Sequence, residues 1–433
     1  MPRRCIPRFA SLSTVLAALA ALAACAPPMV PAPLAPPQPP YGYGPPPSPR
    51  LQPAPPTAAA PSGPAKIALL VPLSGPNAGL GNAILDAAQL ALFETGGSQL
   101  TLVPRDTRGT PAGAADAARS AVGGGAALIL GPLLAGEVEA VKPIARDAHV
   151  NVIAFSTVTD LAGGNTYLMG FLPRQEVVRE VAYARQRGMA RFAALAPNTP
   201  YGHLMTDALR EAASSTGATV TKVAFFDARG GDPSTAIADL LPAGSPALPP
   251  SGPGVPGQAA PDQAAPAPPP PAVPSFDALL LPEGGDHLKE IARKLASAGL
   301  DSKATRLLGS GLWDVPDIGN DPTLDGGWFA ASPPDARREF EQRYRATYGG
   351  EPPRLASLGY DAAALASALA SGKSGPPFSR QAILNPNGFS GVDGLFRFMP
   401  DGLVQRGLAV LEVEPQGNVV VSPAPQSFQD LGY

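Results

Sequence analysis

The sequence predicts an α/β protein of two lobes, each a mostly parallel sheet flanked by helices. The first observation is an unbroken apolar run of strand length at 66–72, which is typical of a strand buried on both faces. The second is that such runs alternate with segments whose apolar residues recur at helical spacing. The third is that this alternation occurs twice along the chain, which predicts two sheets with right-handed crossovers.

The first half of the globular region supplies the first of these two units. Strands are expected at 66–72, 99–104, 127–130 and 150–155, and helices at 78–93, 111–122 and 137–147. In sheets of this kind, ligands bind beyond the carboxyl ends of the strands. Residues in the loops after these strands are therefore the first candidates for a site.

The second unit repeats the pattern. Strands are expected at 191–196, 219–226, 276–281 and 306–308, and helices at 176–187, 204–213, 234–241 and 288–298. Two further helices, at 337–348 and 355–369, precede a hairpin-like stretch at 394–402 and an apolar segment at 407–414. Pro400, Asp401 and Gly402 provide turn chemistry in that hairpin.

The domain organisation follows from these elements. We expect a first lobe made of 66–171 plus 311–390, and a second lobe made of 172–310 plus 391–433. The 56 prolines concentrate in two blocks, and the later block, at 242–274, cannot build a core. We interpret it as a disordered insertion in the second lobe, because the strand and helix pattern resumes unchanged after it.

The N-terminal segment is expected to be a lipoprotein signal peptide over 1–24. A basic start and a short apolar stretch end in Leu22, Ala23, Ala24 and Cys25, which resembles a bacterial lipobox. The apolar stretch is too short for a spanning helix, which needs ~20 apolar residues. The resemblance implies a lipid on Cys25, whereas the alternative is an ordinary secretory signal that ends near a cysteine. Ala26 in place of Asp resembles Gram-negative lipoproteins of the outer membrane.

The earlier proline block makes 25–65 a lipidated cysteine followed by a disordered stalk. Proline fixes the backbone near the polyproline II conformation, so this stalk could reach on the order of 100 Å at ~3.1 Å per residue. It acts either as a passive spacer, which we favour, or as a docking site for a proline-recognising partner.

Composition excludes several functions. The net charge of −3 provides no basic field for nucleic acid, and the lipid is the one expected contact with a membrane. The histidines, His149, His203 and His287, lie on separate predicted elements without metal-ligand spacing. Gly309-Ser310-Gly311 is not the Gly-x-Ser-x-Gly motif of a hydrolase. We therefore expect no enzyme activity, no metal and no cofactor.

Several short motifs carry a family resemblance. KIALLVPLSG at 66–75, Gly131-Pro132-Leu133, Phe155-Ser156-Thr157, FEQRYRATYG at 340–349 and Gly391-Val392-Asp393-Gly394 follow in this order. Together they resemble type I periplasmic binding proteins over nearly all of 66–421. Two groups share that fold: the Leu/Ile/Val-binding proteins of ABC transporters, and the penicillin-binding protein activator lipoproteins. The sequence segments at 71–76 and 167–173 resemble the second group more closely.

The resemblance and the strand ends select the candidate residues of a ligand cleft, which are Ser74, Gly75, Gly131, Pro132, Ser156, Thr157, Tyr201 and Glu283. The loop at 74–81 could hold an anion on its backbone N–H groups, or could simply be a tight turn. Ser156 and Thr157 could contact a ligand's carboxylate and amine, or could cap a turn. Tyr201 and Glu283 occupy positions where the amino-acid binders place an aromatic residue and an acid.

Two functions remain from the sequence. In the first, favoured by the tether and stalk, an outer-membrane lipoprotein reaches inward, binds a penicillin-binding protein and regulates peptidoglycan synthesis. In the second, a solute-binding protein delivers a branched-chain or other amino acid to an ABC transporter.

Overall fold

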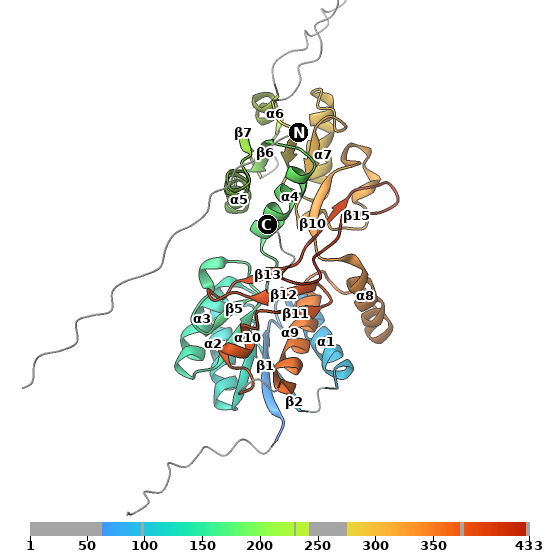
Figure 1. Cartoon of the computed structure of the whole chain (residues 1–433). Coiled ribbons are helices and arrows are strands. Elements are labelled where there is room, and N and C mark those ends of the chain that lie inside the picture. The colour runs from blue at the N-terminus through green and yellow to red at the C-terminus, as the bar shows by residue number, and fades with distance from the viewer. Residues whose placement is uncertain (1–62, 97–98, 229–230, 242–274, 373–375, 430–433) are drawn as a thin grey trace, which may run out of the picture. The chain divides into compact units, whose positions relative to one another are not determined.

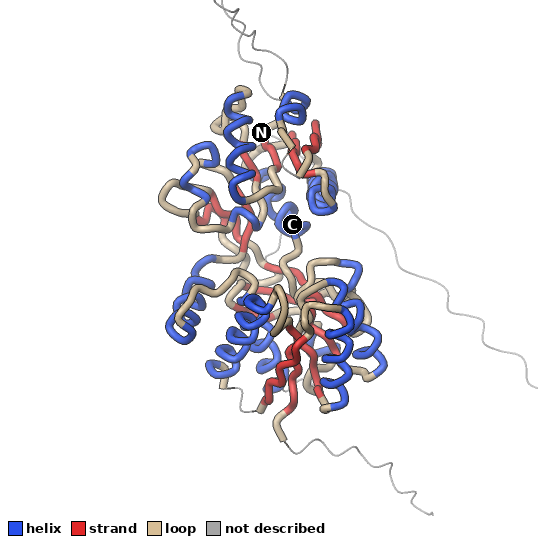
Figure 2. Tube along the Cα trace, turned by 180° about the vertical axis from the view of Figure 1, so that it is seen from behind, coloured by secondary structure: helices blue, strands red, loops and turns tan. Residues whose placement is uncertain are grey.

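The computed structural model describes residues 63–96, 99–228, 231–241, 275–372 and 376–429 (Figure 1). Within them, the expected α/β class is confirmed: two mostly parallel sheets are flanked by helices, as Figure 2 also shows. Cys25, the stalk and the insertion at 242–274 lie outside the described residues. Among the helices that are described, none combines the length and apolarity needed to cross a bilayer.

The first sheet has five parallel strands in the order β2-β1-β3-β4-β5. The strands are β1 (Ala65–Val71), β2 (Leu100–Asp106), β3 (Ala126–Leu130), β4 (Asn151–Ala154) and β5 (Thr166–Leu168). The helices packed on it are α1 (Ala78–Glu94), α2 (Pro111–Gly123), α3 (Ala135–Asp147) and α9 (Ala356–Ser371).

Side-chain alternation along β1 explains why this sheet is covered on both faces. Ile67 and Leu69 pack into the core that holds α1 and α9, whereas Ala68 and Leu70 pack into the core that holds α2 and α3. Successive residues of a strand point to opposite faces, so an unbroken apolar run requires a helical layer on each side.

The second sheet has seven strands in the order β15-β14-β10-β9-β8-β6-β7. Five of them are parallel, namely β6 (Arg191–Pro197), β7 (Thr219–Phe226), β8 (Ala278–Leu280), β9 (Arg306–Leu308) and β10 (Trp328–Ala331). Two antiparallel strands, β14 (Ala409–Glu412) and β15 (Val419–Ser422), extend it beyond β10. Its helices are α4 (Pro173–Gln186), α5 (Pro200–Ser215), α6 (Ser234–Leu240) and α7 (Gly285–Ser297).

A small antiparallel sheet, β11-β12-β13, completes the sheet inventory of the described residues. Its strands are β11 (Phe389–Gly391), β12 (Gly394–Phe398) and β13 (Val404–Arg406), with α8 (Pro334–Tyr348) and α10 (Arg380–Ile383) nearby in the chain. Phe396, Phe398 and Val404 are buried in the same core as β1 and α9. This sheet therefore belongs with the first lobe.

Two segments lie with a different sheet from the one expected. β10 falls within 311–390, which we placed in the first lobe, but it pairs with β9 and β14 of the seven-stranded sheet. β12 and β13 fall within 391–433, which we placed in the second lobe, but they pack on the first core. The chain passes between the sheets more often than the sequence pattern indicated. The pattern did not reveal these crossings because β10 is only four residues long.

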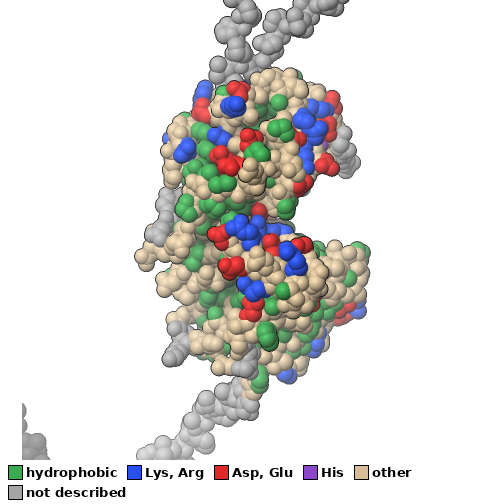
Figure 3. Space-filling view, turned by 90° about the vertical axis from the view of Figure 1, so that its right-hand side faces the viewer, with side chains coloured by type: hydrophobic (Ala, Val, Ile, Leu, Met, Phe, Trp, Pro, Cys, Tyr) green, Lys and Arg blue, Asp and Glu red, His purple; other side chains and the backbone are tan. Residues whose placement is uncertain are grey.

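The charged side chains of α8 are neutralised locally. Arg338 pairs with Asp335, Arg343 lies 2.9 Å from a carboxylate oxygen of Glu94, and Arg345 pairs with Glu351. On the face shown in Figure 3, which includes the side occupied by α8 in Figure 1, acidic and basic side chains are interspersed.

Candidate functional site

A cavity of about 260 Å³ opens where chain segments from both sheets meet. Its residues follow the carboxyl ends of β4, β5, β6, β9 and β10, or lie on β13 and just before α9 and β14. They are Thr157, Phe171, Leu172, Pro173, Gln175, Glu176, Tyr201, Gly311, Leu312, Asp314, Ala331, Ser332, Arg354, Leu355, Arg406 and Leu408. This is where α/β folds place their ligands.

Local sequence signals fix two of these residues at helix starts. Thr199 caps α5 by accepting a hydrogen bond from the Gly202 N–H at 3.2 Å, and Pro200 occupies the first turn. Tyr201 is therefore held beside the cavity at the beginning of α5. In the same way, Pro173 begins α4 and sets Glu176 in its first turn.

One wall of the cavity is apolar and contains an aromatic ring with two cations close to it. The Phe171 ring centroid lies 4.2 Å from Cζ of Arg354 and 4.8 Å from Cζ of Arg406. Cations near a desolvated ring face are held by its quadrupole, by up to ~2 kcal/mol. Leu312 and Leu408 add further apolar surface. The wall thus combines an apolar surface with positive charge.

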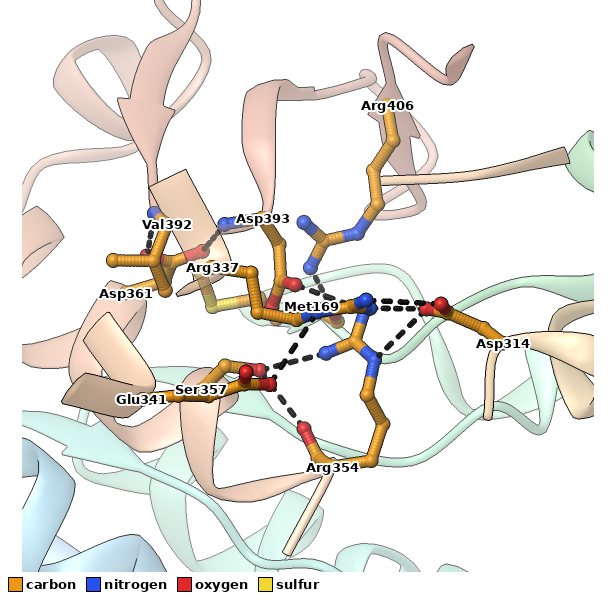
Figure 4. A network of polar contacts seen from close by, with 10 residues as sticks. All are labelled: Met169, Asp314, Arg337, Glu341, Arg354, Ser357, Asp361, Val392, Asp393 and Arg406. Carbon is orange, nitrogen blue, oxygen red and sulfur yellow. Dashed lines mark hydrogen bonds and ion pairs between the residues drawn. The ribbon is translucent and has the colours of Figure 1, made fainter. Parts of the chain in front are cut away.

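Arg406 is the buried cation of this wall. Arg406 is 3% exposed, and its Nη2 donates a hydrogen bond to the Met169 carbonyl at 2.6 Å (Figure 4). Its Nε and Nη1 have no hydrogen-bond partner among the described residues. Burial lowers the pKa of Arg406, and the nearby carboxylates Asp393 and Asp361 oppose that effect. A guanidinium offers five N–H donors in a planar fork, and a carboxylate is the acceptor that matches two of them.

Two buried acids compensate that charge unequally. Asp361 accepts backbone hydrogen bonds from Val392 at 2.7 Å and Asp393 at 3.3 Å, yet burial and then the charge of Asp393 raise its pKa to about 7. Burial also disfavours ionisation of Asp393, but Arg354 and Arg406 hold its pKa below the usual value. Its Oδ1 lies 2.9 Å from Nη2 of Arg354. Asp393 is therefore the ionised member of the pair.

Asp314 extends this network to the second sheet. It follows a short 3-10 helix, Gly311–Trp313, after β9, and its side chain is 6% exposed. Arg337 of α8 donates to both of its oxygens, and Arg354 Nε lies 3.6 Å away (Figure 4). Asp314, which comes from the lobe with the seven-stranded sheet, thus contacts two arginines from segments that pack on the other lobe.

Glu176 and Tyr201 add acidic and hydroxyl groups to the cavity lining. Glu176 Oε2 accepts a hydrogen bond from the Gly311 N–H at 2.8 Å, and no described residue donates to Oε1. Because Glu176 lines the cavity, part of it stays accessible, but burial raises its pKa to about 7. Tyr201 hydrogen-bonds to Ser310, and burial raises its pKa, as do the charges of Glu176, Glu180 and Glu283. Ser332 is 2% exposed, and its Oγ has no partner among the described residues.

The structure brings only two of the sequence-predicted residues to the cavity, Thr157 and Tyr201. Ser74 Oγ donates to Asp106 at 2.7 Å, and Gly75 has a φ of +80° in the same turn. Glu283 Oε1 accepts from the neighbouring Gly284 N–H at 3.1 Å.

The remaining candidates serve the strand ends of the first sheet. The Gly131 N–H donates to Ile153 at 2.8 Å, and a side chain at Gly131 would collide with the Leu70 carbonyl. The Pro132 carbonyl accepts from the Phe155 N–H at 2.9 Å. Ser156 Oγ accepts from the Val158 N–H at 3.2 Å. Ligand contact by these residues stays a prediction.

The sequence reasoning missed Arg406, Ser332 and Glu176. Arg406 did leave a signal, since it occupies the same strand face as buried Val404, where a charge is costly. Glu176 left none, because an acid in the first turn of a helix is ordinary helix chemistry. Among the described residues, no group of three or more His, Cys, Asp or Glu side chains could hold a metal ion.

Two α/β sheets with a cavity at their strand ends define a two-lobed binding protein. The family comparison makes this specific: the model for periplasmic binding proteins matches residues 64–418, so the chain belongs to that family. Membership indicates a periplasmic location. No curated protein sequence matches the chain.

Several solved structures of transporter proteins have a similar fold. A putative branched-chain amino acid ABC transporter protein of Rhodospirillum rubrum is 20% identical, with a TM-score of 0.67 over 83% of this chain and 100% of its own. LivJ of Streptococcus pneumoniae, in complex with isoleucine, is 20% identical, with a TM-score of 0.55 over 83% and 100%. A solute-binding protein of R. palustris, in complex with benzoate, is 18% identical, with a TM-score of 0.55 over 84% and 98%. At these identities the likeness shows the fold.

Proposed function

We propose that the chain is a periplasmic solute-binding protein whose cavity holds a small carboxylic acid with an apolar body. The observation that carries this proposal is Arg406, a cavity-lining guanidinium that is 3% exposed and has two donors without a partner in the described structure. A buried donor left unpaired is costly, and a carboxylate is the acceptor that suits a guanidinium fork best.

The size and lining of the cavity limit the rest of the solute. About 260 Å³ is below the range of ~300–1,000 Å³ typical of sites for drug-sized ligands. Phe171, Leu312 and Leu408 offer apolar contact beside the charged groups. Isoleucine and benzoate, which the solved relatives of similar fold contain, share these features: each has one carboxylate and a compact apolar body.

This proposal replaces the function that the sequence favoured. The similar structures are solute-binding proteins of transporters, and they support delivery of a solute better than activation of a penicillin-binding protein. Capture of a peptidoglycan synthase by the chain remains the second candidate, motivated only by the lipobox and the proline-rich stalk. A lipid on Cys25 and an outer-membrane location are likewise proposals, which Cys25→Ala and mass spectrometry of the mature N-terminus would test.

The binding proposal is tested by calorimetry of the full chain with L-isoleucine, L-leucine and benzoate. At a ligand concentration of 100 Kd, binding stabilises the native state by about 2.7 kcal/mol, which a thermal shift detects. Arg406→Met should abolish binding of every acid. Arg406→Lys, which keeps the charge opposite Asp361 and Asp393, guards against misfolding and should weaken binding at least tenfold.

Arg397→Met is the matched control for these variants. Arg397 lies on β12 of the same small sheet, but its guanidinium contacts Gln405 and the Pro386 carbonyl and does not line the cavity. It should leave binding intact. Capture of a penicillin-binding protein from membrane extract, with no acid bound, would overturn the proposal in favour of the second candidate.

A further inference from the structure

A buried ion pair connects the two lobes. Asp314 directly follows Trp313, which is fully buried in the core of the seven-stranded sheet, so the backbone of Asp314 moves with that lobe. The Asp314 side chain is 6% exposed and accepts hydrogen bonds from Arg337 on both of its oxygens. Arg354 Nε lies 3.6 Å from its Oδ2 (Figure 4). The contact is charged and bidentate, which is the geometry of the strong hydrogen bonds in proteins.

Both arginines are fixed to the lobe of the five-stranded sheet. Arg337 lies on α8, and one turn later Phe340 is 1% exposed and packs with α1 in a buried cluster. Arg354 donates to Ser357 of α9 at 2.9 Å, and its Nη2 lies 2.9 Å from Oδ1 of Asp393. Because these anchors do not involve the second lobe, a rotation that separates the lobes draws the acid away from both guanidinium groups.

The same ion network lies where the chain passes between the lobes. The crossing segments are 169–172, between β5 and α4, 332–333, between β10 and α8, and 407–408, between β13 and β14. Arg406 Nη2 donates to the Met169 carbonyl in the first crossing, and Arg406 directly precedes the third. Arg337 follows the second crossing within one helical turn. The network therefore contacts or adjoins each of the segments about which the lobes would rotate.

The charge of Asp314 stabilises the joined lobes specifically. In the joined arrangement this acid contacts two guanidinium groups, whose like charges would repel each other without it. Removing one member of a buried ion pair is strongly destabilising, because it leaves an uncompensated charge. Once the lobes separate, water would solvate the same guanidinium groups, so the penalty applies to the joined arrangement alone. Another polar contact between the lobes, from Gln175 to the Val404 carbonyl, is neutral and does not respond to this charge.

We propose that Asp314 is an electrostatic latch, whose pairing with Arg337 and Arg354 holds the two lobes together without any solute in the cavity. The inference goes beyond the proposed function, because it concerns the motion of the lobes and holds whichever solute the cavity takes. A switch is one of the best-attested uses of a buried ion pair. The latch predicts that the lobes separate when the charge of Asp314 is removed, and stay joined when the cavity is merely empty.

The experiment measures the distance between the lobes with two spin labels on the full chain, without added solute. Cys5→Ser and Cys25→Ser remove the native thiols, and Glu139→Cys on α3 and Ser214→Cys on α5 place one label on each lobe at an exposed position. This parent should show one distance. In Asp314→Asn the ratio of separated to joined lobes should rise ~100-fold, so that a second distance becomes visible.

A reciprocal variant and a matched control accompany the test. Arg337→Gln should produce the same second distance, so the test does not depend on the folding of one variant, which circular dichroism checks. The double variant should separate the lobes no further than the stronger single variant, because both changes remove one contact. Asp321→Asn is the control: the Asp321 side chain is 11% exposed and pairs with Arg293 at 3.3 Å within the lobe of the seven-stranded sheet. It should leave the distance unchanged.

Three results would overturn the latch. In the first, the parent without solute already has separated lobes as its main population and joins them only when L-leucine or benzoate is added. In the second, Asp314→Asn and Arg337→Gln both keep the distance of the parent. In the third, Asp321→Asn changes the distance as much as Asp314→Asn does. Calorimetry with the acids decides the proposed function separately, so each proposal can fail without the other.

Discussion

Replacing Arg354 with methionine tests whether the buried ion network holds the site together. Asp393 is 0% exposed, and its Oδ1 lies 2.9 Å from Arg354 Nη2. In Arg354→Met the carboxylate stays buried, but it loses its principal counterion. The same substitution removes the contacts of Arg354 with Ser357 and with Asp314.

The expected loss can be estimated from the burial of the two partners. Removing one member of a buried ion pair typically costs ~3–5 kcal/mol, because it leaves an uncompensated charge. The Arg354 side chain is 31% exposed, and Arg406 still faces Asp393, so we expect about 3 kcal/mol, the lower end of that range. Asp393→Asn leaves Arg354 with other partners and should cost about 1 kcal/mol.

The double variant isolates the pair from its surroundings. Arg354→Met with Asp393→Asn removes both members of the pair, so it should be about 2 kcal/mol more stable than the sum of the single losses indicates. Urea unfolding should be followed by circular dichroism as well as by fluorescence. The two tryptophans, Trp313 and Trp328, both lie with the seven-stranded sheet and report on that lobe alone.

The pH dependence gives a second check on the same reasoning. In the native protein the pKa of Asp393 is lowered, so its contribution to stability is present above its unfolded pKa and is lost as pH falls through the folded value. Without Arg354 that pKa should rise, and the deficit of Arg354→Met should narrow as the pH is lowered. Single losses that add within 0.5 kcal/mol, with a deficit independent of pH, would refute the ion-pair account.

Two further predictions concern stability. Glu176→Gln should raise the free energy of unfolding above pH 7. Folding raises the pKa of Glu176 from 4.5 to about 7, so this carboxyl group favours the fold most below pH 4.5. As the pH rises through 7, the native protein loses up to ~3 kcal/mol of its free energy of unfolding. Urea titrations at pH 5 and pH 8 check this, and the same gain in the free energy of unfolding at both pH values would contradict it. Glu139→Gln, on the exposed side of α3, is the control. Gly359→Val should destabilise by at least ~2 kcal/mol, since even a Cβ there would lie 2.2 Å from the Ile84 carbonyl oxygen. Ala368→Val, exposed on the same helix, should be tolerated, and equal melting temperatures would refute the argument.

Much of the fold could be predicted because its strands are strongly apolar. The run at 66–72 indicated a strand covered on both faces, and β1 is such a strand: it lies between β2 and β3, with helices on both faces of its sheet. β10 and β13 were missed as parts of their sheets because they are short, and their pairing depends on distant segments. Sequence distance alone could not show which sheet each of them joins.

The site was less predictable than the fold. Thr157 and Tyr201 follow strands, so a general rule about strand ends located them. Arg406 comes from a hairpin far along the chain, and its meaning depends on burial beside Phe171 and Asp393. Glu176 is an ordinary helix acid until Gly311 is folded against it. These properties arise only from tertiary contacts.

The chain closes its cores only with its last segments. α9 is the main partner of α1 on the first sheet, and β14 pairs with β10 to complete the antiparallel side of the second. Contacts of such large sequence separation form slowly, because loop closure must precede their stabilising effect. Neither core is therefore complete until residues beyond 350 have joined it, so a chain that ended before α9 would leave α1 without its main packing partner.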